Sequence, residues 1–407
     1  MRRDYIWNTL GSSANSFISL LLLIVVTRVN GIDNSGLFSL CSNYAFLFFV
    51  IGIYGGRIYQ VSDVNGEFES KNYIFMKFLT GIAMMITAIV FIIVNDYDME
   101  RSALLLSLSA YKLTDALADP LYGIVQRKDR LYWAGISMFT KAIIGFVAFV
   151  IVDVLTQNII LASLCLLIAN ILFIFAWDIP RVIKVEQITN LFKGNMAQSL
   201  FLIRNSGYVF IIAFLIYLLP NIIRNFVDIN HSQATVGWYG IIIMPATLLN
   251  LFVSFIIQPK LISLSESYAA KQYSDFDKSV SKIMIVCILF GIVVTFIVWL
   301  IGCPVFSFIY EKDLYPYRLA LTLVVLGGTI NTLMLICNYI LSIMRKFSIQ
   351  IIGCIFGVVT AIVASLILVA PGVPNAVNGS IWAFLISVSI QSAFFVIGYK
   401  IILKKQM

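Results

Sequence analysis

The chain has few charged residues, and this shortage already narrows its class. Only 12% of its 407 residues are Asp, Glu, Lys or Arg, against about 25% in ordinary soluble domains, whereas 60% are hydrophobic. One aqueous core cannot bury that much apolar surface, so the surplus has to face lipid. Barrel-like alternation is absent and apolar runs of about 20 residues recur, which predicts an all-α polytopic membrane protein.

Sequence signatures of catalysis and of metal binding are missing as well. There is no GxxxxGK[ST] phosphate loop, no HExxH zinc motif and no GxSxG nucleophile elbow, so we predict no catalytic residue, no metal site and no enzyme activity. The six cysteines are scattered without a CxxC pair. The only histidine, His231, is expected in a solvated loop. We attribute the net charge of +8 to basic cytoplasmic loops, not to nucleic-acid binding.

Hydropathy predicts about twelve transmembrane helices in two sets of six. The first set covers residues 6–29, 35–53, 73–94, 102–122, 131–152 and 158–177. The second covers residues 196–219, 235–257, 283–302, 319–344, 347–370 and 380–402. The predicted organisation is an N-terminal six-helix bundle at 1–177, an amphipathic cytoplasmic linker at 178–195 and a C-terminal six-helix bundle at 196–407.

The basic residues predict the orientation of these spans. When the N-terminus is placed in the cytoplasm, Lys and Arg outside the spans favour the cytoplasmic side by roughly four to one, as the positive-inside rule requires. Both termini are therefore expected in the cytoplasm.

Charges inside the predicted spans are few, and each costs roughly 2.5–3.5 kcal/mol on insertion scales, so they are usually retained for function. The fourth span carries Lys112, Asp115 and Asp119, whose spacing puts them on one helix face. Lys141 and Arg204 lie at a similar depth in the fifth and seventh spans. We expect the three cations to line a positively charged central cavity. A purely structural alternative is that Lys112 and Asp115 neutralise each other while Asp119 reaches headgroup water.

Three short fragments carry a resemblance to a known family. They are the opening NTLGSS at 8–13, the TRV at 27–29 followed by GLF at 36–38, and the segment 122–130. With the number and length of the spans, they resemble bacterial polysaccharide-repeat-unit flippases, the O-antigen exporters of the multidrug/oligosaccharidyl-lipid/polysaccharide (MOP) exporter superfamily. The resemblance implies two bundles in a MATE-like V around a cationic cavity that opens alternately to each side of the bacterial inner membrane.

The same resemblance implies an undecaprenyl-pyrophosphate-linked oligosaccharide as substrate, with a polysaccharide polymerase and a chain-length regulator as partners besides membrane lipids. It implies no cofactor, and coupling to protons or sodium. Our hypothesis is that Lys112, Lys141 and Arg204 hold the pyrophosphate, with Asp115 and Asp119 as ion-coupling sites. Further substrate contacts are expected from Arg28, Asn8 and Asn205.

Two other functions remain open at this stage. A multidrug or cation exporter of the same superfamily is the nearer one, although such proteins usually need acidic sites for cationic ligands. A membrane-embedded polysaccharide polymerase or glycosyltransferase is the other, although no large extramembrane loop is predicted.

Overall fold

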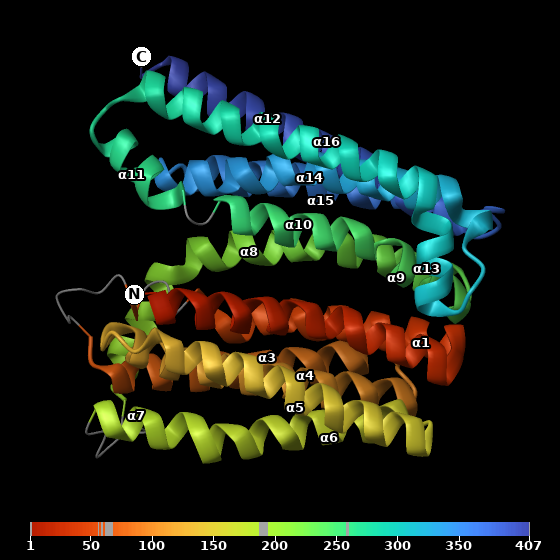
Figure 1. Cartoon of the computed structure of the whole chain (residues 1–407), viewed down its shortest axis with the longest axis horizontal. Helices are drawn as coiled ribbons and strands as arrows, with labels where there is room; N and C mark the ends of the chain where they lie inside the picture. Colours follow the sequence, from red (N-terminus) through yellow and green to blue (C-terminus); the bar gives the residue numbers. More distant parts are fainter. Residues whose placement is uncertain are drawn as a thin grey trace. The chain divides into compact units, whose positions relative to one another are not determined.

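A computed structural model describes residues 2–55, 57, 60–61, 68–186, 194–257 and 260–406 (Figure 1). Across these residues the regular structure is helical, with no strand. Ten of the helical segments described are long and apolar enough to cross a membrane. The all-α membrane fold expected from hydropathy is confirmed.

Helix α1 (Arg2–Ile53) contains the first two predicted spans. Its backbone breaks at Gly31, whose φ of 84° suits a residue without a Cβ. The hydroxyl oxygens of Thr27 and Ser35 lie 2.8 Å apart, whereas eight residues of a continuous helix rise about 12 Å. The chain therefore folds back at Gly31, and α1 provides two crossings.

The first half of the chain continues with four further crossings. They are α3 (Ser70–Val94), α4 (Met99–Arg127), α5 (Leu131–Thr156) and α6 (Ile159–Phe173). A π-helical turn (Ile174–Asp178) extends α6 into α7 (Ile179–Val185). Helix α4 is not one of the ten apolar segments, because it carries the buried charges. With α4 included and α1 counted twice, the described chain accommodates the twelve predicted crossings.

The second half is built around α14 (Arg318–Ile343), which packs against α10 (Met244–Ile257), α12 (Tyr273–Ile297) and α16 (Ala376–Lys404). The other elements are α8 (Met196–Asn230), α9 (Gln233–Ile242), α11 (Leu261–Ala269), a π-helical turn (Val298–Gly302), α13 (Cys303–Tyr310), a 3₁₀ turn (Tyr315–Tyr317) and α15 (Phe347–Leu368). The predicted span 235–257 is thus two helices, interrupted just before Pro245.

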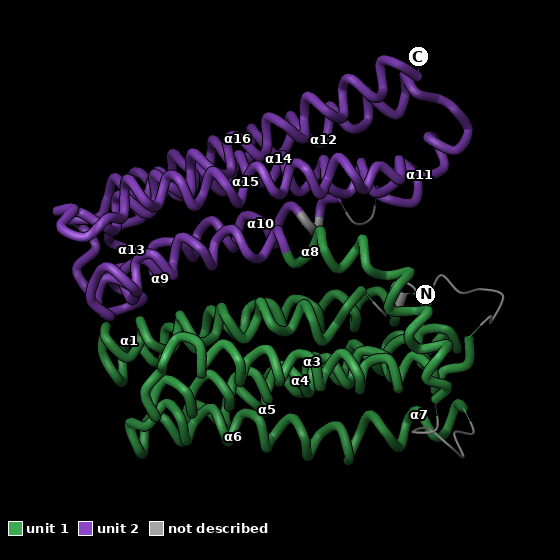
Figure 2. Tube along the Cα trace, turned by 180° about the vertical axis from the view of Figure 1, so that it is seen from behind, with its two compact units in different colours: residues 1–214 green, residues 215–407 purple. Residues whose placement is uncertain are grey.

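The chain divides into two compact units, Met1–Phe214 and Leu215–Met407, coloured separately in Figure 2. The division falls within α8, whose first turns belong to the first unit. There the Asn195 amide donates to Asn72 Oδ1 at 2.8 Å, and Ser199 Oγ donates to the Asn72 carbonyl oxygen at 3.1 Å. The linker predicted at 178–195 begins within the helical extension of α6, and its residues 187–193 lie outside the described residues. The domain boundaries drawn from the sequence stay a prediction.

Helices α1 and α5 touch backbone to backbone. A Cβ added to Gly11 would lie 2.3 Å from the carbonyl oxygen of Gly135, and one added to Gly135 would lie 2.3 Å from the carbonyl carbon of Trp7. Small residues allow such close approach between membrane helices.

Gly135→Ala is therefore expected to lower the free energy of unfolding by about 1–3 kcal/mol, the usual cost of overpacking, because α1 and α5 have to separate. The melting temperature of the purified protein in detergent measures this. Gly207→Ala is the matched control, since its nearest outside atom is the Tyr54 hydroxyl at 4.0 Å. Equal melting temperatures for the two variants would contradict the close packing.

Candidate functional site

The buried face of α4 organises the candidate site. Lys112 and Asp119 are only 5% and 8% exposed, and Asp115 between them is nearly as well covered. As the spacing predicted, the three side chains point into protein. They join two separate ion-pair networks, both within the first unit.

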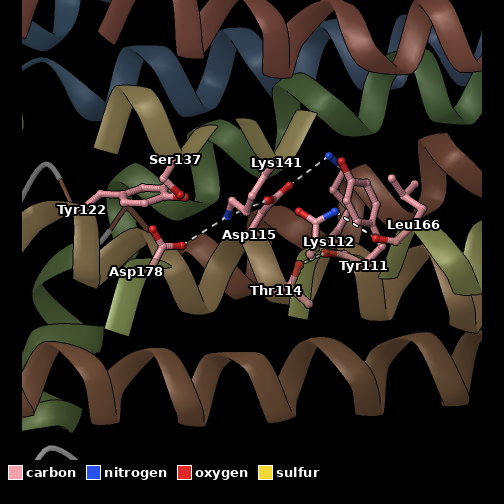
Figure 3. Close-up of polar contacts among 10 residues, drawn as sticks. Tyr111, Lys112, Thr114, Asp115, Tyr122, Ser137, Lys141, Leu166 and Asp178 are labelled. Carbon is pink, nitrogen blue, oxygen red and sulfur yellow. Dashed lines mark hydrogen bonds and ion pairs between the residues drawn. The ribbon is translucent and has the colours of Figure 1, made fainter. Parts of the chain in front are cut away.

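The first network, here called the Lys141 network, links α4, α5 and the π-helical turn (Figure 3). Lys141 Nζ lies 3.8 Å from Asp115 Oδ1 and 3.9 Å from Asp178 Oδ2. Lys112 Nζ lies 3.3 Å from Asp115 Oδ2. Asp115 is therefore shared by two lysines, and Lys141 is shared by two aspartates. The Lys141 distances exceed ordinary hydrogen-bond lengths, so these contacts are ion pairs without a hydrogen bond.

Aromatic rings surround the lysines of this network. Lys112 Nζ lies 4.4 Å from the centroid of the Phe46 ring and 4.6 Å from that of Tyr111, both within cation–π range. Lys141 Nζ lies 5.3 Å from the Tyr122 ring, and the Tyr122 hydroxyl pairs with Ser137 Oγ at 3.0 Å. The rings compensate part of the cost of keeping ammonium groups away from water.

The second network joins α3 to α4. Lys77 Nζ lies 2.9 Å from Asp119 Oδ2 and also donates to the carbonyl oxygen of Ile53. Lys77 is 1% exposed. Lys77 is therefore enclosed by protein at the start of α3 and does not extend into solvent. The purely structural alternative expected Asp119 to reach headgroup water, whereas in the structure its carboxylate contacts the buried Lys77.

Arg57 lies beside this second network, outside the membrane-spanning segments. Its Nε and Nη2 atoms donate to Gln126 Oε1 at 3.1 and 2.9 Å. Burial lowers the pKa of the Arg57 guanidinium, whereas the charges of Asp119 and Tyr122 raise it. An arginine remains protonated under such a shift, so Arg57 adds fixed positive charge at this end of α4.

The two networks are balanced in charge. They pair the three lysines Lys77, Lys112 and Lys141 with the three carboxylates of Asp115, Asp119 and Asp178. Sequence reasoning found neither Lys77 nor Asp178 as a partner. A lysine of these networks therefore becomes available to an anion only when one carboxylate is protonated or displaced from it.

Two pockets lie at the ends of the Lys141 network. Lys112 is the charged lining residue of a pocket between the two halves of α1 and α4, which Ser19, Ser42 and Tyr111 also line. Asp178 and Tyr122 line a second pocket between α4, α5 and α7. The network thus runs from one pocket to the other through Lys141 and Asp115.

The remaining predicted contacts lie at other places in the first unit. Arg204 and Asn205 are exposed on α8. Arg28 is exposed near the fold-back of α1, where Asn30 Nδ2 donates to both carboxylate oxygens of Asp153 at 2.8 Å. Asp153 lies twelve residues beyond Lys141 on α5, a rise of about 18 Å, so Arg28 and Lys141 differ in depth.

Asn8 lies at yet another level of the first unit. Its backbone nitrogen is 2.6 Å from the position of a Cβ added to Gly135, about one and a half turns before Lys141 on α5. Of the six predicted substrate contacts, the structure brings together only Lys112 and Lys141, through Asp115. No group of His, Cys, Asp and Glu among the described residues has the arrangement of a metal site.

Mutation of the Lys77–Asp119 pair tests how much this buried ion pair matters for the stability of the protein. Lys77→Met is expected to destabilise the protein by about 3–5 kcal/mol, because Asp119 is left charged and unpaired, whereas Lys77→Met combined with Asp119→Leu recovers most of that loss. The yield and melting temperature of the purified protein are the measurements. The exposed pair Lys278–Asp275, 3.6 Å apart, supplies the control, and Lys278→Met should leave both unchanged. A double variant as unstable as the single one would contradict this account.

Comparison with known protein sequences gives one weak relative. No family model matches the chain. It is 22% identical over 322 residues to the capsular polysaccharide biosynthesis protein CapF of Staphylococcus aureus, which covers 77% of this chain and 78% of CapF. This likeness is too distant to assign a family by itself.

Solved structures give a clearer likeness. A multidrug-resistance MATE-family transporter of the MOP superfamily, in its inward-facing conformation, has a TM-score of 0.74 at 10% identity, over 98% of either chain. The outward-facing conformation of such a transporter has a TM-score of 0.68 at 11% identity, over 99% of this chain and 95% of that one. The Vibrio cholerae MATE transporter VcmN, in its bent form, has a TM-score of 0.63 at 12% identity, over 100% and 97%. The chain has the fold of these MOP-superfamily transporters over its whole length.

Proposed function

We propose that this protein is a flippase that moves an undecaprenyl-pyrophosphate-linked oligosaccharide from the cytoplasmic to the periplasmic leaflet of a bacterial inner membrane, with both termini in the cytoplasm. Two findings together support the proposal. The chain has the fold of MOP transporters, and its sequence is distantly similar to that of a capsular polysaccharide biosynthesis protein. Repeat units of O-antigen or a related surface polysaccharide are the proposed cargo, and a polymerase with its chain-length regulator would use the product.

Physical chemistry explains why such a cargo needs a protein. Each unsatisfied polar group costs several kcal/mol in hydrocarbon, and each charge costs more, so a pyrophosphate and its sugars do not cross unaided. A polar, charged path lowers that cost while the lipid tail stays in the bilayer. The inside-negative membrane potential favours outward movement of an anion by about 2.3 kcal/mol per charge per 100 mV.

The Lys141 network suggests how an anion would be held. Lys112 faces a pocket, so it is the proposed first contact for the pyrophosphate, and Lys141 lies behind it across Asp115. While Asp115 is ionised it competes with the substrate for both lysines. A proton on Asp115 would leave the Lys112 ammonium free for phosphate oxygens, while Lys141 would keep Asp178 as its partner. The headgroup would meet the other predicted contacts at other stages of its passage, because they lie at other positions: Arg28, Asn8, Arg204 and Asn205.

Asp115→Asn tests this coupling. The amide mimics a permanently protonated Asp115, so we expect substrate binding to persist while translocation no longer responds to an imposed pH gradient. Transport into proteoliposomes, with and without the gradient, is the measurement, and sodium replaces the proton gradient in a parallel arm. Asp119→Asn is the comparison, because Asp119 pairs with Lys77 in the other network. Wild-type transport that ignores both gradients would rule out coupling at Asp115.

Deletion of the gene in its own host tests the function as a whole. We expect surface polysaccharide to disappear and the lipid-linked repeat unit to accumulate in the cytoplasmic leaflet, with recovery of both on complementation. Normal polysaccharide in the deletion strain would contradict the proposal. Loss of polysaccharide without accumulation of the lipid-linked unit would point instead to a polymerase or glycosyltransferase, the alternative from another class.

A multidrug or cation exporter is the second candidate, favoured by the description of the structural neighbours as multidrug-resistance transporters. Cationic dye efflux from cells that express the protein separates the two functions. We expect efflux at the level of cells without it, because each carboxylate of the Lys141 network already has a lysine partner.

A further inference from the structure

The central helix of the second unit, α14, carries polar residues that the proposed function does not use. Asn331, Asn338 and Ser342 are seven and four residues apart, so they fall within about 40° of one another around the helix axis. Asn331 and Asn338 are half-buried and Ser342 is exposed, whereas the neighbouring Met334 and Cys337 are buried in the unit. These three polar residues, here called the polar face of α14, are therefore accessible.

The polar face lies inside the membrane-spanning part of α14. Asn331 is about 18–20 Å from the two ends of the helix, which places it near the middle of the bilayer. Asn338 and Ser342 follow towards the turn that contains Arg345, on the side that the positive-inside rule assigns to the cytoplasm. Amide and hydroxyl groups are costly to place against hydrocarbon, so this face has to meet protein, water or a polar ligand.

The buried Gln350 on α15 fixes the orientation of Asn338. Its Nε2 donates to Asn338 Oδ1 at 2.8 Å, to the Asn338 carbonyl oxygen at 2.7 Å and to Ser342 Oγ at 2.9 Å. Gln350 is 0% exposed, so packing sets its position. The Nδ2 group of Asn338 donates to no described residue and is not enclosed by protein. Asn338 therefore presents amide N–H donors that are held in place and open to a ligand.

Asn331 presents the complementary group, a hydrogen-bond acceptor. Its Nδ2 donates to Asn250 Oδ1 on α10 at 3.4 Å, a long hydrogen bond. Its own Oδ1 accepts from no described residue and is likewise not enclosed. Asn331 and Asn338 are two helical turns apart, about 10 Å, so the face offers an acceptor near the middle of the membrane and donors nearer the cytoplasmic end of α14.

The helices around the polar face carry almost no charge. Helices α10 and α15 contain no Asp, Glu, Lys or Arg, and α14 contains only Arg318, its first residue, at the end opposite Ser342. A phosphate is best bound by a cation, which the Lys141 network supplies in the first unit. Sugar hydroxyls both donate and accept hydrogen bonds, so neutral amides match them. The chemistry of this face fits a neutral polyhydroxyl ligand better than a pyrophosphate.

We propose that the polar face of α14 binds hydroxyl groups of the oligosaccharide that the lipid carries. The inference rests on the proposed function and extends it, because Lys112 in the first unit is the contact for the pyrophosphate, whereas Asn331 and Asn338 are the contacts for sugar residues. A site built to hydrogen-bond hydroxyl groups discriminates strongly against ligands that lack them, since its polar groups then stay unpaired. The polar face therefore selects the cargo by its sugars.

Binding of two lipids to the purified full-length protein tests this site. One lipid is undecaprenyl pyrophosphate without sugars, and the other is the lipid-linked repeat unit extracted from the host. We expect the wild type to bind the sugar-bearing lipid more tightly by roughly a hundredfold, about tenfold for each amide. Asn338→Leu and Asn331→Leu should each weaken binding of the sugar-bearing lipid about tenfold and leave binding of the sugar-free lipid unchanged.

The variants are chosen to disturb packing little. Asn338→Leu leaves Gln350 Nε2 with two acceptors, the carbonyl oxygen of residue 338 and Ser342 Oγ. Asn331→Leu changes a different contact, so it keeps the test valid if Asn338→Leu fails to fold. Thr360→Val is the matched control, because Thr360 lies about 15 Å along α15 from Gln350 and its hydroxyl donates to the Phe356 carbonyl oxygen of its own helix. It should bind both lipids like the wild type.

The two lipids separate failure of this site from failure of the proposed function. Equal affinity of the wild type for both lipids, or unchanged binding of the sugar-bearing lipid by both Asn variants, would overturn the sugar site and leave the flippase proposal standing. Equal weakening for both lipids would also overturn it, because the amides would then only hold helices together. A wild type that binds neither lipid would overturn both proposals.

Discussion

Lys112→Met is expected to reduce translocation of the lipid-linked oligosaccharide about a hundredfold while leaving protein abundance close to that of the wild type. Asp115 keeps Lys141 as a partner when Lys112 is lost, so no buried carboxylate is left unpaired. The pocket, however, loses its cation. Truncation of one partner of a buried charge pair costs about 2–5 kcal/mol in recognition, and a hundredfold lies within that range.

The comparison with Lys112→Arg separates charge from shape. Arginine keeps the positive charge and should retain a measurable part of the transport. If Lys112→Met supports normal levels of surface polysaccharide, Lys112 does not bind the substrate, and the pocket beside it has no role in transport.

Lys141→Met is expected to lower the stability of the protein about as strongly as Lys77→Met does. Lys141 is the cation that faces Asp178, and it is 4% exposed. Its removal takes from the buried Asp178 its lysine partner and leaves only Ser137 and Arg181 to stabilise the carboxylate, so the cost approaches about 3–5 kcal/mol, that of a broken buried ion pair. Since native proteins are stable by only about 5–15 kcal/mol, we expect the amount of folded protein to fall severalfold or more.

The double variant Lys141→Met with Asp178→Asn distinguishes the stability effect from the transport effect. It removes both members of the pair, so folded protein measured by size-exclusion chromatography should recover, while transport should stay low because one of the two lysines beside Asp115 is missing. Wild-type abundance for Lys141→Met alone would show that the pair contributes little to folding.

Hydropathy was sufficient to predict the fold class, because each crossing needs about 20 apolar residues whatever its neighbours are. Helical periodicity alone predicted that Lys112, Asp115 and Asp119 share one face of α4, and that face is buried in the structure. Both conclusions rest on local properties of single helices.

The partners of these charges were not predictable in the same way. Depth along a helix follows from residue number, but the direction in which a side chain points depends on how the neighbouring helices are rotated. Arg204 was grouped with Lys112 and Lys141 by depth, yet it lies exposed on α8. Asp178 was assigned to a linker because the apolar run ends at Trp177, whereas the π-helical turn continues the helix and places Asp178 at Lys141.

The ion-pair partner of Lys77 was not predicted from the sequence either. It lies at the start of an apolar run, where a lysine normally extends to the headgroups. Tertiary packing instead covers it with Asp119 and with Ile53 at the end of α1. A search for an acidic residue at matching depth on a neighbouring span would have suggested the pair, because buried lysines require partners.

Translocation in proteoliposomes is the most direct measurement of the central claim that this protein moves a pyrophosphate-linked lipid oligosaccharide. Purified protein is reconstituted with a fluorescent undecaprenyl-pyrophosphate oligosaccharide, and a membrane-impermeant quencher reports the fraction in each leaflet over time. We predict rapid exchange with the wild-type protein and slow exchange, close to that of empty liposomes, with Lys112→Met. Wild-type vesicles that behave like empty liposomes, or that move a cationic dye instead, would contradict the account.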